Sequence, residues 1–217
     1  MDIERDPELP GRLLRVERDA LIPLLRARPE ADFAIRTCCP GWTVRHVLAH
    51  CGSALMRVVE SRFEVGVFSP ESNDRDIAER TGWSNARVVD ELERGMTEAG
   101  PVIAAAEHGM LDGIALGEWV HGGDVLDAFG EPGAYAGEGL PLALELLAHL
   151  TRARRTVPLR ALLDDRDEPL VLGADSPDHA VYAGPAATLI RLIAARPLTG
   201  TRYELTGAWE NELTFFD

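Results

Sequence analysis

Three histidines and one glutamate in the first two thirds of the chain have the spacing of metal ligands. His46 and His50 are four residues apart, and Glu118 lies three residues before His121. On an α-helix, residues three or four apart project from nearly the same face. A Glu-x-x-His pair on one helix that faces a histidine on another is a common metal site of helical bundles. The spacing therefore predicts a divalent metal site, and the alternative is a set of solvated or hydrogen-bonded polar side chains.

The surroundings of these residues favour the metal site. His50 lies within an apolar stretch of its segment, and Trp119 and Val120 separate Glu118 from His121. A histidine buried between two apolar helices needs a polar partner, and a shared metal supplies one. Zinc is the expected ion, because imidazole and carboxylate suit it and three protein ligands leave one position open for water or substrate. The predicted ligands are His50, Glu118 and His121.

The three cysteines, Cys38, Cys39 and Cys51, form neither a CxxC pair nor a disulfide framework. Their number and spacing are typical of reduced thiols in the cytosol. We interpret Cys39 and Cys51 as small buried residues, and the alternative is thiol chemistry by the protein itself.

Hydrophobic periodicity predicts five helices that must position these side chains. They cover residues 9–28, 44–62, 85–103, 111–129 and 140–154, and Thr43 and Ser84 are suitable N-caps for the second and third. Residues 69–76 are polar and are predicted as a loop with a short helix after it. The second and fourth helices carry the candidate ligands.

The pattern changes after residue 155, where short apolar runs replace long periodic ones. Strands are predicted at residues 170–172, 180–182, 201–206 and 213–216, with a helix opened by Gly184 and Pro185. We therefore expect an α+β fold, with a helical bundle domain at residues 1–155 and a small α+β domain at residues 156–217.

The composition excludes several classes of protein. The 217 residues carry a formal net charge of −14, which argues against nucleic acids and anionic membranes as partners. No apolar run approaches the length of a membrane span and the first residues are acidic, so a cytoplasmic location is expected. All 22 basic residues are arginine, which indicates a GC-rich genome such as that of an actinobacterium.

Two motifs and the tail resemble a known family. The segments are CPGWTVR at residues 39–45 followed by VLAH at 47–50, then GEWVHGGD at 117–124, and in the tail GPAA at 184–187 and ELTG at 204–207. They resemble the mycothiol-dependent maleylpyruvate isomerases, a branch of the DinB-like metal-binding bundles. The resemblance covers nearly the whole chain in the right order. It implies an up-down four-helix bundle followed by a small C-terminal domain. It also agrees with the absence of lysine, because mycothiol is an actinobacterial thiol.

The resemblance implies an enzyme that uses a metal and mycothiol. The metal would bind the thiol as thiolate. Addition of the thiolate to the double bond of maleylpyruvate, rotation and elimination would give the trans isomer, and a relative would transfer the thiol to another electrophile. His50, Glu118 and His121 would hold the metal, and Asp124 would orient His121. Arg196 is the candidate for binding a carboxylate of the substrate or the thiol, or else a solvated arginine at a helix end.

Two departures from the family pattern keep alternatives open. The family usually places its glutamate four residues before the histidine, where this chain has Gly117. It also commonly has aspartate where this chain has His46, so His46 is an additional ligand or a residue that supports one. The expected partners are a small electrophile or organic acid and a low-molecular-weight thiol. The protein itself is expected to be a monomer or a homodimer. The alternative function is a non-catalytic protein that binds a thiol or a small acid.

Overall fold

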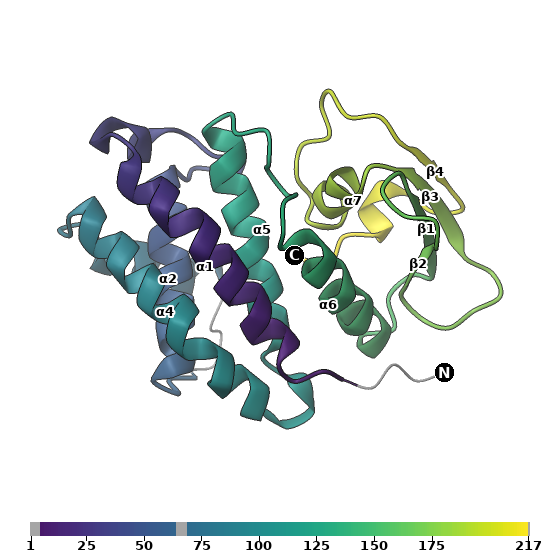
Figure 1. The fold of residues 1–217 in the computed structure, drawn as a ribbon, viewed down its shortest axis with the longest axis horizontal. Coiled ribbons are helices and arrows are strands. Elements are labelled where there is room, and N and C mark those ends of the chain that lie inside the picture. The colour runs from purple at the N-terminus through teal and green to yellow at the C-terminus, as the bar shows by residue number, and fades with distance from the viewer. Residues whose placement is uncertain (1–4, 64–68, 217) are drawn as a thin grey trace. The chain divides into compact units, whose positions relative to one another are not determined.

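The computed structural model describes residues 5–63 and 69–216, and the chain divides into two compact units, Asp6–Ala134 and Tyr135–Asp217. The first is helical, and the second combines two helices with a four-stranded sheet (Figure 1). The predicted α+β class is confirmed. Among the described residues, no helix combines the length and apolar character that a membrane crossing requires.

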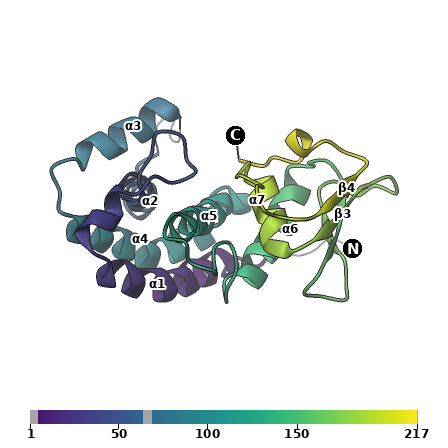
Figure 2. The same cartoon turned by 90° about the horizontal axis from the view of Figure 1, so that it is seen from above.

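The helical unit is built on four long helices, which Figure 2 shows from a second side. Its elements are α1 (Leu9–Ala27), η1 (Glu30–Ala34), α2 (Val44–Val59), α3 (Pro70–Glu79), α4 (Asn85–Ala105), η2 (Glu107–Gly109) and α5 (Asp112–Ala128). Helices α1 and α2 each pack against both α4 and α5. Consecutive helices α1 and α2 therefore lie at opposite corners, whereas the simplest up-down bundle makes such helices neighbours. The segment between them, which contains η1, is long enough to cross the bundle.

Helix α2 begins at a capping box that positions its histidines. The Thr43 side chain accepts a hydrogen bond from the backbone N–H of His46, and the His46 ring accepts one from the backbone of Thr43. This reciprocal pairing satisfies two N–H groups that a helix start leaves free. From this cap onward α2 is buried over most of its length, so His50 and Cys51 face the interior of the unit.

The predicted loop at residues 69–76 is wrong, because this segment belongs to α3 (Pro70–Glu79). Ser69 caps the helix by accepting a hydrogen bond from the Ser72 N–H at 3.2 Å, and proline follows at the first turn, where it is well tolerated. An ion pair between Asp76 and Arg57 of α2 holds this polar helix against the bundle. The helix thus depends on a tertiary contact that periodicity does not reveal.

The C-terminal unit contains α6 (Leu140–Ala153), α7 (Ala186–Ile193) and a mixed sheet with the strand order β2-β1-β3-β4. The strands are β1 (Leu159–Leu163), β2 (Leu170–Leu172), β3 (Ala180–Gly184) and β4 (Glu204–Thr206). Strands β1 and β3 pair in parallel, and the two outer pairings are antiparallel. Helix α6 packs against β2. It belongs to this unit, whereas a boundary at residue 155 assigns it to the bundle domain.

In this unit one strand is present that the sequence did not predict, and one predicted strand is absent. Strand β1 was not expected, although it alternates buried and exposed residues and forms the centre of the sheet with β3. The predicted strand at residues 213–216 is wrong, since this segment is irregular. Its Phe215 N–H donates to the Ile193 carbonyl at the end of α7, and the Phe215 ring lies under the Arg154 guanidinium at 4.1 Å. Packing against two helices replaces strand pairing there.

Candidate metal centre

His50 lies in the interior of the helical unit with one ring nitrogen unsatisfied. Only 8% of the residue is exposed, and its Nδ1 has no hydrogen-bond partner. Burial, with a smaller contribution from His121, lowers the pKa of His50 to about 3. The imidazole is therefore neutral at physiological pH, which is the form that binds metals.

His121 faces His50 from α5, and the two ring centroids are 5.3 Å apart. Its Nδ1 lies 2.9 Å from Oδ2 of Asp124, which is completely buried. A carboxylate at this nitrogen assigns the proton to Nδ1 and leaves the lone pair on Nε2. The contact matches the orienting role that the family resemblance implies for Asp124.

Glu118 is also buried on α5, and its Oε2 has no hydrogen-bond partner. Its carboxyl group interacts with the thiol of Cys51, the residue that follows His50 on α2. Burial raises the pKa of Glu118 to about 8. The shifted spacing relative to the family pattern therefore still places this carboxyl group inside the bundle, toward α2.

His50, Glu118 and His121 offer donor types that suit a divalent cation, but among the described residues the ligand atoms that lie within 4.8 Å of one another are those of Cys38, Cys39 and Asp124, not of these three. Two buried atoms, His50 Nδ1 and Glu118 Oε2, are unsatisfied on facing helices, and such atoms are costly unless another group binds them. Two imidazoles and a carboxylate are ligands that zinc accepts. A cation at this place would also offset the burial that makes the charged form of Glu118 unfavourable.

His46 has a different environment. Its ring takes part in the capping box of α2, and burial together with Arg36 and Arg45 lowers its pKa. Two nearby guanidinium groups make this position unfavourable for a further cation. The contacts of His46 are those of a helix cap, and its role as an additional ligand stays a prediction.

Cys38 and Cys39 form a second group of donors around Asp124. The Cys38 thiol donates to Oδ1 at 3.1 Å and the Cys39 thiol to Oδ2 at 3.2 Å. Ligand atoms of the three side chains lie within 4.8 Å of one another, which is close enough to hold a metal ion. Cys39 is buried, as predicted, but it also reaches a carboxylate 85 residues away in the sequence. No local spacing signals this cluster.

Comparisons with known proteins identify the family of the helical unit. Residues 14–124 match the family model of the mycothiol maleylpyruvate isomerase N-terminal domain, over about half of the chain. The chain belongs to this family. The match ends at Asp124 and includes every candidate ligand of the bundle.

Solved structures of the maleylpyruvate isomerase show the same fold. The crystal structure of the mycothiol-dependent maleylpyruvate isomerase has a TM-score of 0.58 and 20% sequence identity, covering 94% of this chain and 95% of that one. A histidine-to-alanine mutant of that enzyme matches with the same TM-score and coverage at 19% identity. No curated protein sequence gives a match.

Glu17 is a buried carboxyl group of the family domain that the sequence analysis missed. It lies on α1 and packs against Gly122 of α5, where a Cβ atom would overlap its carboxyl oxygen and lie 2.9 Å from its carboxyl carbon. Burial raises the pKa of Glu17 to about 8. A glycine inside a helix costs stability relative to alanine. Gly122 therefore serves to admit this carboxyl group beside the helix turn that carries His121.

Arg196 lies in the C-terminal unit, just after α7. Its Nη1 donates to the Ala194 carbonyl at 3.0 Å, which holds the guanidinium close to the helix end. Its proposed role as a carboxylate-binding residue of the maleylpyruvate isomerase type stays a prediction.

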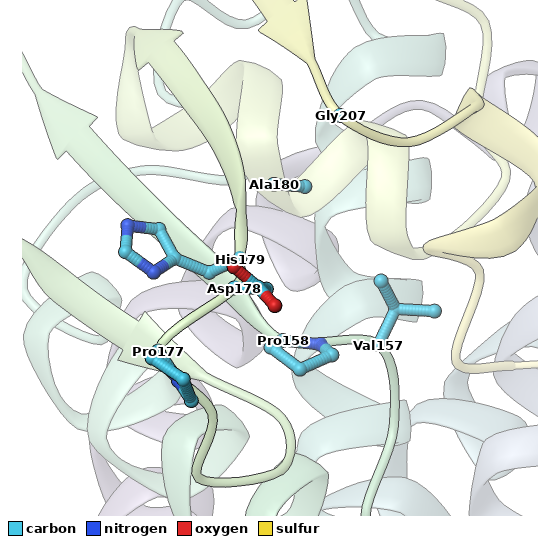
Figure 3. Close-up of a pocket in the computed structure, with 7 residues that line it drawn as sticks. All are labelled: Val157, Pro158, Pro177, Asp178, His179, Ala180 and Gly207. Carbon is cyan, nitrogen blue, oxygen red and sulfur yellow. The ribbon is translucent and has the colours of Figure 1, made fainter.

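The C-terminal unit also has a hollow of about 470 Å³ beside the starts of β1 and β3 (Figure 3). Two of its lining residues, Asp178 and His179, are titratable, and both are exposed. Its other lining residues are Val157, Pro158, Pro177, Ala180 and Gly207. The hollow lacks the buried converging donors of the family domain, so the metal chemistry is better assigned to the bundle.

Proposed function

We propose that the protein is a metal-dependent enzyme of the maleylpyruvate isomerase type that uses mycothiol. It would isomerise a small unsaturated acid or transfer the thiol to another electrophile. The observation that carries the proposal is the pair of unsatisfied buried atoms, His50 Nδ1 and Glu118 Oε2, on facing helices. Family membership supports it, because the family is named for a mycothiol-dependent isomerase.

In this proposal His50, Glu118 and His121 hold zinc, the ion that suits their donors. Bound zinc supplies a positive charge that keeps a coordinated thiol in the thiolate form at neutral pH. Asp124 fixes the orientation of His121 by accepting its Nδ1–H. The centroid of the Trp42 ring lies 5.1 Å from that of His50 and 6.3 Å from that of His121, so the indole packs beside both imidazoles.

The negative charge of the chain means that a small acid can bind as substrate only at a local positive site. A net charge of −14 repels anions in general. A cation between α2 and α5 provides a local positive site that offsets this repulsion. The substrate class that we propose, from the family resemblance, is an unsaturated or otherwise electrophilic organic acid.

Metal analysis of the purified chain tests the site directly. In a Cys38→Ser background, which removes one donor of the cluster around Asp124, we expect about one zinc per chain, bound by the three ligands. His50→Ala and His121→Ala should each lose this zinc, whereas His179→Ala, which replaces an exposed histidine of the C-terminal unit, should retain it. A wild-type chain without bound metal, and with no gain in thermal stability when zinc is added, would rule out the site.

Thiol-dependent turnover tests the activity. With zinc and mycothiol present, the wild-type chain should isomerise maleylpyruvate or consume thiol against a panel of electrophilic acids, and His50→Ala should not. A zinc-loaded chain that is inactive against the whole panel would contradict the enzymatic proposal.

One observation favours a second candidate, a non-catalytic protein that binds a thiol or a small acid. Glu118 is displaced by one residue from the family position and interacts with the Cys51 thiol. If this contact persists when zinc is present, the cation has fewer protein ligands and the site serves for binding. Calorimetry that detects thiol binding without turnover would support this candidate.

A further inference from the structure

The two adjacent cysteines lie in a turn whose backbone is held by several hydrogen bonds. Arg36 and Thr43 form an antiparallel bridge, and the Thr37 N–H donates to the Trp42 carbonyl at 3.1 Å. The Trp42 N–H donates to the Cys39 carbonyl at 3.0 Å. Such a turn fixes the positions of both thiols before any ligand binds, which reduces the entropic cost of binding.

Both thiols donate to one carboxylate. Cys38 Sγ lies 3.1 Å from Oδ1 of Asp124, and Cys39 Sγ lies 3.2 Å from Oδ2. Asp124 is 0% exposed, so its negative charge needs strong partners. A thiol is a weak hydrogen-bond donor, whereas a thiolate is a strong metal ligand. Asp124 also contacts His121 Nδ1, and the ligand atoms of Cys38, Cys39 and Asp124 lie within 4.8 Å of one another, which is close enough to hold one cation.

We propose that Cys38, Cys39 and Asp124 form a second cation site, selective for soft divalent ions such as Zn²⁺ and Cd²⁺. On binding, each thiol releases its proton to solvent and two sulfur–metal bonds form, with no change in oxidation state. Two protons leave as one divalent cation enters, so the net charge of this buried cluster is unchanged. Because a carboxylate has two oxygens, one can bind the cation while the other keeps its contact with His121.

This site differs in chemistry from the one formed by His50, Glu118 and His121. Thiolates select soft ions over Mg²⁺, Ca²⁺ and Mn²⁺, whereas imidazole and carboxylate accept a wider set. The two donor sets meet at the contact between Asp124 and His121. The inference does not rest on the proposed function, since it uses donors that the isomerase proposal does not assign as ligands.

Absorption spectroscopy with Co²⁺ or Cd²⁺ alone tests this site on the full-length reduced chain. Thiolate ligation gives a sulfur-to-metal charge-transfer band in the ultraviolet, at longer wavelength for Co²⁺ than for Cd²⁺, and imidazole and carboxylate do not. We expect the band to saturate at one cation per chain and to disappear in Cys38→Ser and in Cys39→Ser. Cys51→Ser, which replaces a buried thiol outside the cluster, and His50→Ala should both retain it. Absence of the band in the wild-type chain, or its persistence in both cluster variants, would overturn the inference.

A measurement on the wild-type chain avoids dependence on variants that fold poorly. Cys38 is partly exposed, so an alkylating reagent can reach it in the native protein. Mass spectrometry should show that Cd²⁺ protects Cys38 from alkylation and that Mg²⁺ does not. Equal alkylation with and without Cd²⁺ would contradict the site. Retention of the band in an inactive His50→Ala chain would separate this site from the proposed function.

Discussion

His50 and Arg57 are two of the buried polar residues of helix α2, and their surroundings differ. Arg57 forms an ion pair with Asp76 of α3, and the two side chains are only 6% and 3% exposed. Nearby, the guanidinium of Arg80 binds Glu91 of α4 through two nitrogens. His50, two turns earlier, leaves its Nδ1 without a partner. The Arg57 end of the helix is thus paired with an acidic side chain of another helix, whereas His50 has no charged side chain bonded to its buried Nδ1.

The two environments indicate two different roles, one in helix packing and one in binding. A buried charge that is paired within the chain fixes how helices pack, and removing its partner is costly. A buried donor without a partner is a cost that a bound group can remove. The Arg57 end of α2 therefore holds α3, whereas the His50 end has a buried ring nitrogen that a bound group could satisfy.

The largest effect should come from breaking the paired end. Asp76→Ala leaves the Arg57 charge buried and unpaired, which should lower the free energy of unfolding by about 3–5 kcal/mol. Urea denaturation followed by circular dichroism measures this loss. Asp74→Ala, an exposed neighbour on the same helix, should change it by less than about 0.5 kcal/mol. Equal effects for the two variants would show that the ion pair does not hold α3.

The free energy of unfolding should depend on pH, because buried carboxyl groups of the helical unit have raised pKa values. Burial raises the pKa of Glu17 from 4.5 to about 8, so the folded state holds a proton that the unfolded state has lost at neutral pH. The stability that this proton provides is complete below pH 4.5 and is lost as the pH rises to 8. For metal-free protein the loss between pH 5 and pH 8 should be on the order of 3 kcal/mol.

Glu17→Gln should reduce this pH dependence, as measured by denaturation at a series of pH values. Glu118 contributes in the same direction, because burial raises its pKa as well. The double variant with Glu118→Gln should remove both contributions and leave the opposite trend of His50, whose lowered pKa makes the stability rise as the pH increases toward 6.5. A slope that Glu17→Gln leaves unchanged would mean that Glu17 is already ionised in the fold.

The regular part of the bundle could be predicted from the sequence because its signals are local. Thr43 and Ser84 cap helices as expected, and α1, α4, α5 and α6 begin and end within two residues of their predicted limits. Helix α3 could not be predicted, because its polar sequence becomes helical through contacts such as that of Asp76 with Arg57. Strand β1 likewise depends on its neighbours in the sheet.

The candidate site divides in the same way. The pairing of His50 with His121 follows from a helical spacing that the sequence displays. The contact of Cys38 with Asp124 joins residues 86 positions apart and has no local signal. The position of Glu17 does have a local signal in the sequence. Glycine inside a helix suggests that another group approaches closely, and Gly122 is such a residue.

A methyl group at Gly122 should have an intermediate effect. Gly122→Ala would overlap the Glu17 carboxyl group and force α1 and α5 to shift, at a cost of about 1–3 kcal/mol. Gly133→Ala is the control, since a Cβ there meets nothing within 4 Å. Thermal unfolding compares the two variants. If Gly122→Ala is as stable as the control, then the close approach of Glu17 is not required.

Removing the cap of α2 should cause the smallest loss of stability. The loss should be confined to the end of the helix that carries His50. Thr43→Ala removes the acceptor of the His46 N–H and should cost about 1 kcal/mol, whereas Thr43→Ser retains a hydroxyl and should cost less. Because loss of a cap loosens the first turns of a helix, amide hydrogen exchange should accelerate at residues 46–48 and not near Arg57, which α3 holds in place. Uniform acceleration along α2 would show that its two ends form one cooperative unit. In that case the ion pair with Asp76 would stabilise the candidate ligand His50 as well as the packing of α3.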